Sequence, residues 1–337
     1  MSPAWERFRA SLAGSGRLPI CVAPLIAADH AAFLQNKSLR SILHSADKLA
    51  DALIGAQRRY EGDFMIVFAE VYVESEAMGC HLEFPEDAPP HIVKTCEPER
   101  LKGTIPQRDG RLPVMLAAAK RVIAELGEAH PVFVSIKDPF SAAVLACGAE
   151  GLFEMLISKP AVARRAIEIS HLNQLRYLEA LLEMGANVIL GAPMASGGIL
   201  GEKHFKAFAL ESIVELLSHV RSAGRLAGLH ICGDSDPILA ELSRIPAHFV
   251  SVESFSKDRW KALVSDGQPH PAVMGYFPTD LLYRGSVEQI EAEVQWEIAS
   301  LHGVPHILAT ACDVPQRCPE GQVRTFLKAA RQWQPGG

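Results

Sequence analysis

The stretch LHICGDSD at 229–236 places two ligands for soft metals, His230 and Cys232, at the end of an apolar run. In an extended strand, alternate side chains project to one face, so these two lie roughly 6.5 to 7 Å apart along the backbone. One tetrahedral zinc ion, with bonds of about 2.0 to 2.3 Å, is within reach of both. Taken alone, however, such a pair is more typical of an ordinary buried strand end.

Two further potential ligands follow other apolar runs. Glu253 ends the segment SVE at 251–253, and Cys312 lies in HILATACD at 306–313. Each alone has an ordinary interpretation, Cys312 as a small buried hydrophobe and Glu253 as a polar strand-end residue. Cys318 is an alternative third ligand, but it follows Pro315 on a predicted loop. Together, His230, Cys232, Glu253 and Cys312 predict a zinc site.

The composition of this ligand set indicates its chemistry. One histidine, two cysteines and a carboxylate differ from the cysteine-rich sets of closed structural zinc sites. The carboxylate is the ligand that an incoming group would displace. If that group is a thiol, zinc stabilises its thiolate at neutral pH and keeps it nucleophilic. The set therefore favours alkyl transfer to sulfur.

The elements that must position these ligands alternate in type along the chain. Continuous apolar runs, typical of strands covered on both faces, predict strands at 19–25, 65–72, 132–137, 187–191, 226–231, 249–252, 272–276 and 306–310. Helical patterns lie at 41–60, 112–126, 149–184, 203–223, 287–301 and 322–333, and Gly185 and Gly224 are expected to end two of these helices. Eight such units predict one (β/α)8 TIM barrel domain over residues 1–337, with ligands gathered at the carboxyl ends of the strands. A doubly wound sheet is the alternative, although no GxGxxG follows the first strand.

Composition excludes several classes of protein. The net charge of −6 and the pI near 6.1 leave no basic stripe for binding nucleic acid. Seven irregularly spaced cysteines indicate thiols in a reducing cytosol rather than a disulfide framework. The early apolar run at 19–28 is too short to span a membrane. It could pass for a signal-peptide core, but a first barrel strand explains it better, so we expect a cytoplasmic protein with no membrane partner.

Two motifs carry a resemblance to a known family. HICGD at 230–234 and ACDVP at 311–315 resemble the zinc motifs of methylcobamide:coenzyme M methyltransferases, which belong to the uroporphyrinogen decarboxylase superfamily of (β/α)8 barrels. The resemblance extends over nearly the whole chain. Further similar segments are FAEVYVESEAMGCHLEF at 68–84, DPFSAA at 138–143, GAPMASGGIL at 191–200 and YFPTDLLYRGSVEQI at 276–290.

The resemblance implies a ligand set, a reaction and partners. It places the zinc ligands at His230, Cys232 and Cys312, with Glu253 as the labile fourth ligand. The reaction it implies is transfer of a methyl group from the cobalt of a methylcobamide to a thiol such as coenzyme M, or to tetrahydrofolate in bacterial relatives. The chain lacks a DxHxxG corrinoid-binding signature, so the corrinoid is expected on a separate partner protein. A homodimer is compatible with the resemblance.

The chain departs from true uroporphyrinogen decarboxylases at two places. Those enzymes carry an arginine-rich stretch around the first strand, whereas PICVAPLIAADH at 19–30 contains no arginine. Glu70 stands where they carry an aspartate. A metal-free decarboxylase of a carboxylated tetrapyrrole and a non-catalytic barrel that binds a corrinoid are the alternative functions.

Three other acidic residues have two interpretations each. Glu70, near a strand end, is a candidate substrate ligand or acid. Asp138 follows a strand and precedes proline, which fits either a catalytic group or a helix N-cap. Asp313 follows a proposed ligand, so it either orients a ligand histidine or turns the loop.

Overall fold

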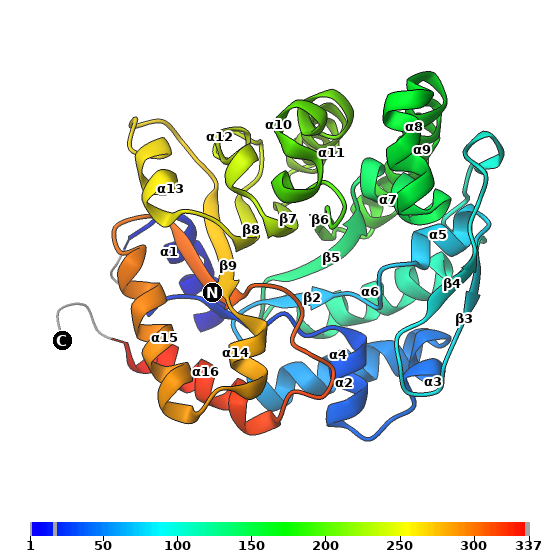
Figure 1. Ribbon diagram of the computed structural model, residues 1–337. Helices are drawn as coiled ribbons and strands as arrows, with labels where there is room; N and C mark the ends of the chain where they lie inside the picture. The colour runs from blue at the N-terminus through cyan, green and yellow to red at the C-terminus, as the bar shows by residue number, and fades with distance from the viewer. Residues whose placement is uncertain (1, 16–18, 334–337) are drawn as a thin grey trace.

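The computed structural model describes residues 2–15 and 19–333, and its centre is a sheet of eight parallel strands (Figure 1). Within the sheet the strands follow the order β1-β10-β9-β8-β7-β6-β5-β2. Their bounds are β1 Val22–Ala23, β2 Met65–Val67, β5 Val132–Lys137, β6 Asn187–Gly191, β7 Ala227–Asp234, β8 Phe249–Ser254, β9 Ala272–Phe277 and β10 His306–Thr310. The sheet curls into a nearly closed barrel, and the predicted TIM barrel class is confirmed.

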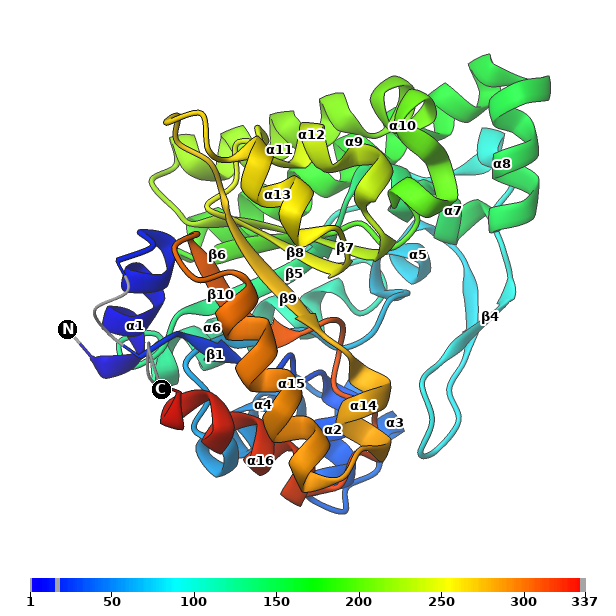
Figure 2. The same ribbon diagram turned by 60° about the vertical axis from the view of Figure 1, so that its left-hand side comes forward.

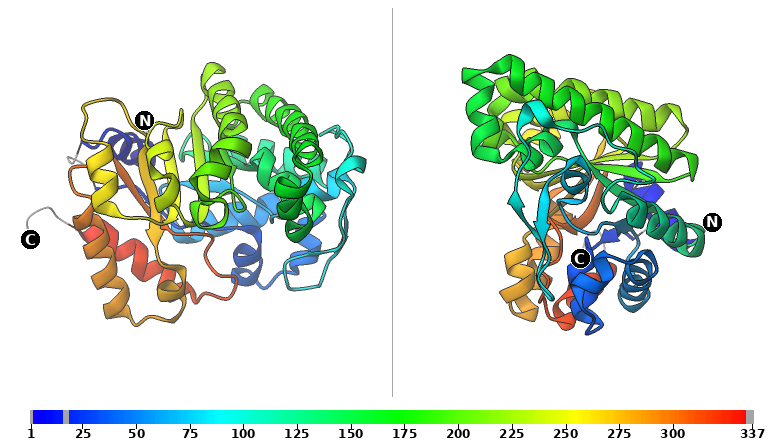
Figure 3. Two further views of the ribbon diagram at one scale, coloured as in Figure 1. Left: turned by 45° about the horizontal axis from the view of Figure 1, so that its top comes forward. Right: turned by 90° about the vertical axis from the view of Figure 1, so that its right-hand side faces the viewer.

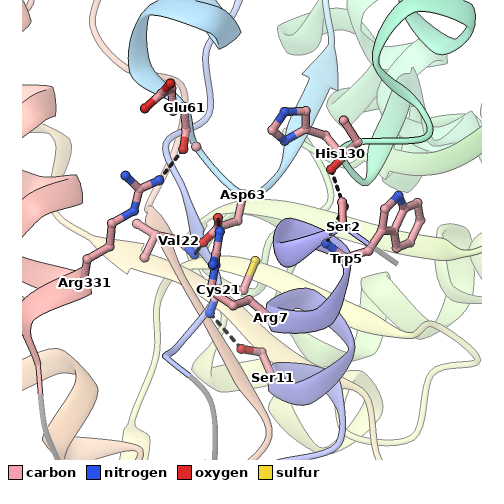
Figure 4. Close-up of polar contacts among 12 residues, drawn as sticks. Ser2, Trp5, Arg7, Ser11, Cys21, Val22, Glu61, Asp63, His130 and Arg331 are labelled. Carbon is pink, nitrogen blue, oxygen red and sulfur yellow. Dashed lines mark hydrogen bonds and ion pairs between the residues drawn. The ribbon is translucent and has the colours of Figure 1, made fainter.

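One backbone hydrogen bond and several side-chain contacts, rather than a strand ladder, join the two ends of this sheet order. The backbone N–H of Asp63, just before β2, donates to the carbonyl of Val22 at 2.9 Å. The Asp63 carboxylate accepts the Val22 N–H at 3.0 Å and pairs with Arg7 at 2.5 Å (Figure 4). Ser11 accepts the N–H of Cys21 at 2.9 Å. The seam between β1 and β2 is therefore closed by polar contacts at the amino ends of the strands.

Helices surround the strands in two groups, α7 to α13 on one side and α2 to α4 with α14 to α16 on the other (Figure 2). The helices are α1 Pro3–Leu12, α2 Ala28–Leu34, α3 Leu39–Leu43, α4 Ala46–Tyr60, α5 Val73–Met78, α6 Leu112–Leu126, α7 Pro139–Cys147, α8 Ala149–Ser158, α9 Pro160–Glu183, α10 Gly197–Phe208, α11 Leu210–Ser222, α12 Leu239–Leu242, α13 Lys257–Leu263, α14 Thr279–Arg284, α15 Val287–Ser300 and α16 Glu320–Gln332. Two 3₁₀ helices span Pro98–Arg100 and Asp236–Ile238.

An aromatic cluster fills the amino end of the barrel. Phe8 of α1 lies 5.8 to 6.2 Å, between ring centroids, from Phe64, Phe133 and Phe249. All four side chains are almost fully buried. Because this end is packed with rings, the opposite end, where the carboxyl ends of the strands lie, is left for chemistry.

Several predicted bounds were wrong for local reasons. The strand expected at 19–25 shortens to Val22–Ala23, since Pro24 has no N–H for a ladder, and the one at 65–72 ends at Val67. The helix expected at 149–184 is two helices, because Pro160 disfavours a helical backbone at Lys159. The segment 203–223 also divides, at Ala209. Gly185 and Gly224 end helices as predicted, with φ of 82° and 71°.

A two-stranded antiparallel hairpin, β3 His81–Glu83 and β4 His91–Lys94, was not predicted. It stands at one side of the barrel, the side that the right-hand view of Figure 3 turns toward the reader. Among the described residues, no single helix combines the length and apolar character of a membrane span; only α7 and α8, bent by 112° to each other, reach those limits as a pair.

Candidate metal centre

His230, Cys232 and Cys312 come together at the carboxyl ends of β7 and β10. Their ligand atoms all lie within 4.8 Å of one another. The Nε2 of His230 is 3.2 Å from the Cys232 Sγ and 3.9 Å from the Cys312 Sγ. All three residues are half-buried. One imidazole nitrogen and two sulfurs, from distant parts of the chain, thus face a common point.

The pairing of β7 with β8 explains how the backbone presents these groups. His230 pairs in register with Ser251, and the register then shifts between Ile231 and Asp234, so that Cys232 and Gly233 lie opposite Glu253 alone. Such a bulge bends a strand and redirects its side chains. Gly233 has a φ of 72°, a conformation that favours glycine. The sequence HICG therefore forms a strand end that turns immediately after its second ligand.

A hydrogen bond fixes the orientation of the His230 ring. The Ser251 hydroxyl lies 3.0 Å from Nδ1, which leaves Nε2 directed at the two cysteines. Burial disfavours a protonated ring, but the hydrogen bond with Cys312 and the nearby negative charges of Cys312, Asp313 and Glu253 outweigh this effect and raise the pKa of His230. Contact with Cys232 and burial raise the pKa of the Cys312 thiol. A bound cation would reverse this preference, because it stabilises thiolates and neutral imidazole.

Glu253 lies at the turn that follows Cys232, but its carboxylate oxygens are not among the ligand atoms that lie within 4.8 Å of one another. Its Oε2 accepts the backbone N–H of Gly233 at 2.6 Å, and its side chain is exposed. The carboxylate is therefore held at the turn that follows Cys232. Cys318, the alternative third ligand, lies elsewhere, fully buried with its sulfur 3.7 Å from the carbonyl of Leu282.

The two acidic residues predicted as catalytic both have structural partners. Glu70 is buried, accepts the backbone N–H of Tyr72 at 2.5 Å and forms an ion pair with Arg111. Burial raises the pKa of Glu70 although Arg111 opposes the shift. Asp138 caps α7, accepting the N–H groups of Phe140 and Ser141, and burial raises its pKa to about 6. A catalytic role for either residue stays a prediction.

Three further residues lie around His230, Cys232 and Cys312: Asp313, and two that the sequence analysis did not identify, Ser251 and Lys137. Burial raises the pKa of Asp313 to about 6, and the contact that orients His230 comes from Ser251. Strand register alone could have identified Ser251, since it pairs directly with His230. Lys137, the last residue of β5, is buried and lies in the same layer of the barrel; its position at a strand end was the available signal.

Comparisons with known proteins place this geometry in context. The sequence pattern of the family described as Uroporphyrinogen decarboxylase (URO-D) matches residues 6–333. The methylcobamide:CoM methyltransferase MtaA of Methanosarcina barkeri (strain Fusaro) is 25% identical over 270 residues, 77% of each chain. A methylated-thiol–coenzyme M methyltransferase of Methanosarcina mazei is 24% identical, covering 78% of this chain and 71% of its own. A uroporphyrinogen decarboxylase of Actinobacillus pleuropneumoniae is 20% identical, covering 87% and 85%.

Solved structures agree on the fold. A methyltransferase from Methanosarcina mazei superimposes with a TM-score of 0.83 at 20% identity and covers 98% of both chains. A B12-independent methionine synthase from Shewanella gives a TM-score of 0.56 at 11% identity, with 84% of this chain and 86% of that one covered. Both likenesses show a shared barrel.

Proposed function

Since the chain belongs to the uroporphyrinogen decarboxylase family, we propose that it is a zinc-dependent methyltransferase, moving a methyl group from a methylcobamide on a partner corrinoid protein to a thiol. Tetrahydrofolate is the second acceptor to test. The observation that carries the proposal is the meeting of His230, Cys232 and Cys312 within 4.8 Å at the carboxyl ends of the strands. The proposal is also supported by the similarity of the chain to two coenzyme M methyltransferases.

The residues present fit zinc. Two sulfurs and an imidazole nitrogen form a soft ligand set that suits zinc better than magnesium or calcium. The Nδ1 of His230 is engaged by Ser251, as expected when Nε2 serves as a metal ligand. Three protein ligands leave a fourth position, the arrangement of catalytic rather than structural zinc. Glu253, whose carboxylate accepts the N–H of Gly233 directly after Cys232, is the residue that we propose for that position.

Each residue has a defined task in the proposed transfer. His230, Cys232 and Cys312 would hold the metal, and Ser251 would keep the imidazole in place. The Gly233 N–H stabilises the Glu253 carboxylate when an acceptor replaces it. Zinc, when bound, supplies a Lewis acid that keeps the acceptor as a thiolate at neutral pH. The carbon–sulfur bond forms as the methyl–cobalt bond breaks, and both electrons of the broken bond stay on cobalt.

The geometry also bears on the partner and the location in the cell. The metal centre lies at the carboxyl ends of the strands, so the corrinoid protein would dock over that face to bring cobalt close. All seven cysteines are free, which suits a reducing cytoplasm. A tetrapyrrole decarboxylase would need cations for the carboxylates of its substrate, but the buried Arg111 is already bound to Glu70 and Glu76.

Metal analysis combined with a methyl-transfer assay tests the proposal. The wild type should contain about one zinc per chain and move a methyl group from methylcobalamin to a thiol. Cys232→Ser and Cys312→Ser should each lose zinc and transfer. Cys318→Ser is the matched control, because this buried cysteine lies away from the centre, and it should retain both.

Three results would contradict the proposal. Wild-type protein without metal would exclude the zinc centre. Zinc content with no transfer to any thiol or folate would instead favour a non-catalytic corrinoid-binding barrel. Turnover of a porphyrinogen by the double variant Cys232→Ser/Cys312→Ser would favour a decarboxylase.

A further inference from the structure

Cys80 and Cys96 face each other at the base of the hairpin formed by β3 and β4. Cys80 directly precedes β3 and Cys96 lies two residues after β4, so the antiparallel pairing of these strands brings the two cysteines together. Their Sγ atoms are 3.5 Å apart, and both are free thiols. A disulfide bond is about 2.0 Å long, so a small movement of the two side chains would join these sulfurs.

Backbone groups of two helices hold both cysteines at this point. The N–H of Cys96 donates to the carbonyl of Ala146 in α7 at 2.8 Å, and the same carbonyl lies 3.2 Å from the Sγ of Cys80. The Sγ of Cys96 lies 3.6 Å from the carbonyl of Met78, the last residue of α5. The sulfurs are therefore kept close by contacts outside the hairpin as well as by its strands.

The two thiols differ in exposure and in acidity. Cys80 is 4% exposed, whereas Cys96 is half-buried. The hydrogen bond with Cys80 and the positive charges of Lys102 and Lys94 lower the pKa of Cys96 to about 7, although burial opposes the shift. The same hydrogen bond and burial raise the pKa of Cys80. Because the thiolate is the nucleophile, Cys96 is the more reactive of the two.

Gly79 brings a lysine stem to the side of the reactive sulfur. Its φ of 112° favours glycine. A Cβ atom at Gly79 would lie 3.6 Å from the Sγ of Cys96 and 3.7 Å from the Cδ of Lys102. The sulfur and the lysine stem thus lie together over a residue without a side chain, which explains the effect of Lys102 on the thiol.

Cys147, at the end of α7, is the other cysteine that interacts with Cys96. Burial and the charge of Cys96 raise the pKa of Cys147 to about 12, so it is protonated at neutral pH. Among residues 2–15 and 19–333, only the candidate metal centre places three such ligand atoms within 4.8 Å of one another. Cys80, Cys96 and Cys147 therefore do not form a second metal site, and the close contact is one between two thiols.

We propose that Cys80 and Cys96 form a reversible disulfide when the protein meets a low-molecular-weight disulfide. The Cys96 thiolate attacks one sulfur of the small disulfide, which leaves a mixed disulfide on Cys96 and releases the other half as a thiolate. That thiolate takes the proton of Cys80, and Cys80 then attacks the Cys96 sulfur. The second half leaves as a thiolate and takes up the proton that Cys96 had lost. Two protein thiols are oxidised, and one small disulfide is reduced to two thiols.

The disulfide would close a covalent loop around a hairpin whose tip contacts other parts of the barrel. The carbonyl of Glu86 accepts the N–H of Arg40 in α3 at 3.0 Å. The carbonyl of Asp87 accepts the side-chain amide of Gln316, in the loop after β10, at 2.7 Å. A cross-link restricts the open conformations of the chain that it encloses. We therefore expect the hairpin to open less often in the oxidised protein.

A tryptic map under non-reducing conditions tests the inference. Trypsin cleaves after Lys94, so Cys80 lies in the peptide 60–94 and Cys96 in the peptide 95–100, each as its single cysteine. Purified full-length protein, incubated with oxidised glutathione and then alkylated, should give these two peptides as a linked pair. Dithiothreitol should separate them. Because the pair is identified by its peptides, oxidation of other cysteines does not interfere.

Alkylation rates and variants assign the role of each cysteine. In the reduced protein at neutral pH, iodoacetamide should modify Cys96 about tenfold faster, or more, than Cys147, which is also half-buried. Cys80→Ser should stop at the mixed disulfide between Cys96 and glutathione, and Cys96→Ser should leave the Cys80 thiol unmodified. Cys147→Ser is the matched control and should form the linked pair as the wild type does.

Hydrogen exchange measures the effect on the hairpin. Amides of residues 81–94 should exchange more slowly in the oxidised wild type than in the reduced wild type. Cys80→Ser treated in the same way should show no such slowing. Thermal unfolding of each variant shows that it is folded.

Several results would overturn the proposal. Both thiols remaining open to alkylation in the treated wild type would exclude the disulfide, and a linked pair between Cys96 and Cys147 would replace it. A wild type that stops at glutathione on Cys96 would remove Cys80 as the second thiol. Unchanged exchange over residues 81–94 would overturn the restraint of the hairpin. None of these readouts depends on methyl transfer, so they leave the proposed function untouched.

Discussion

The Ser251 hydroxyl lies 3.0 Å from the Nδ1 of His230, its register partner on the neighbouring strand. This contact joins β8 to the candidate metal centre and sets which ring nitrogen faces the cysteines. Loss of a partner that orients a ligand histidine typically lowers metal affinity by about 10- to 100-fold. Ser251→Ala should weaken zinc binding by that amount in a competition titration with a chelator. Ser170→Ala, a buried serine of α9, is the control, and an equal loss there would show that the effect is not local.

The seam at Asp63 should dominate the stability of the barrel. Its carboxylate is 1% exposed, pairs with Arg7 and accepts the Val22 N–H, so Asp63→Ala leaves the buried Val22 N–H and the half-buried Arg7 guanidinium without this partner (Figure 4). We expect a loss of about 3 kcal/mol in the free energy of unfolding, measured with urea. Asp51→Ala removes an exposed partner of Arg121 and should cost less than about 1 kcal/mol. A similar small cost for Asp63→Ala would refute the role of the seam.

Gly228 should tolerate no side chain. A Cβ atom there would lie 2.3 Å from the ring of Phe249, inside the aromatic cluster at the amino end of the barrel. Gly228→Ala must displace that ring, and such overpacking costs about 1 to 3 kcal/mol. Gly321→Ala in α16, where nothing lies within 4 Å, should be neutral or slightly stabilising. Thermal unfolding of the two variants compares them directly, and equal midpoints would contradict this packing.

Stability should fall in mild acid because of His306. Burial lowers the pKa of His306 to about 4, so the folded protein resists a proton that the unfolded chain accepts below its ordinary pKa of 6.5. The unfolded state therefore binds more protons between these values, and the free energy of unfolding falls by about 2 kcal/mol as the pH drops from 6.5 to 4. His306→Asn should flatten that part of the profile, measured by urea unfolding across pH. The exposed His44→Asn should leave it unchanged; a profile that His306→Asn does not alter would contradict the assignment.

The parts of the fold that the sequence predicted well depend on local pattern. The strands Val132–Lys137, Asn187–Gly191 and His306–Thr310 have the predicted bounds because each is a continuous apolar run covered on both faces. The two shortest strands of the barrel, β1 and β2, were predicted too long, because side-chain contacts between residues far apart in the sequence replace part of the expected strand pairing. Leu25, for example, gives its N–H to the hydroxyl of Thr310 at 3.0 Å. No local pattern contains such a contact.

The candidate site likewise has features that the sequence predicts and features that it does not. The barrel rule, that strand carboxyl ends meet at one mouth, was enough to bring His230, Cys232 and Cys312 together in prediction. The hydrogen bond from Gly233 to Glu253 depends on a bulge whose register is decided by the pairing of β7 with β8. The alignment of Lys137, Gly191 and His230 in one layer depends on three strands at once. These features arise from tertiary register, which a single sequence does not display.

The polar seam between β1 and β2 also determines where local opening of the barrel should begin. A handful of side-chain contacts around Asp63 replaces the ladder that joins every other neighbouring pair of strands, so local opening should begin there. This weaker join lies at the amino end of the barrel. His230, Cys232 and Cys312 lie at the carboxyl end, on strands of the β7 to β10 ladders, which are continuous apart from the bulge between Ile231 and Asp234. We therefore expect local opening at the seam to leave the candidate metal centre intact.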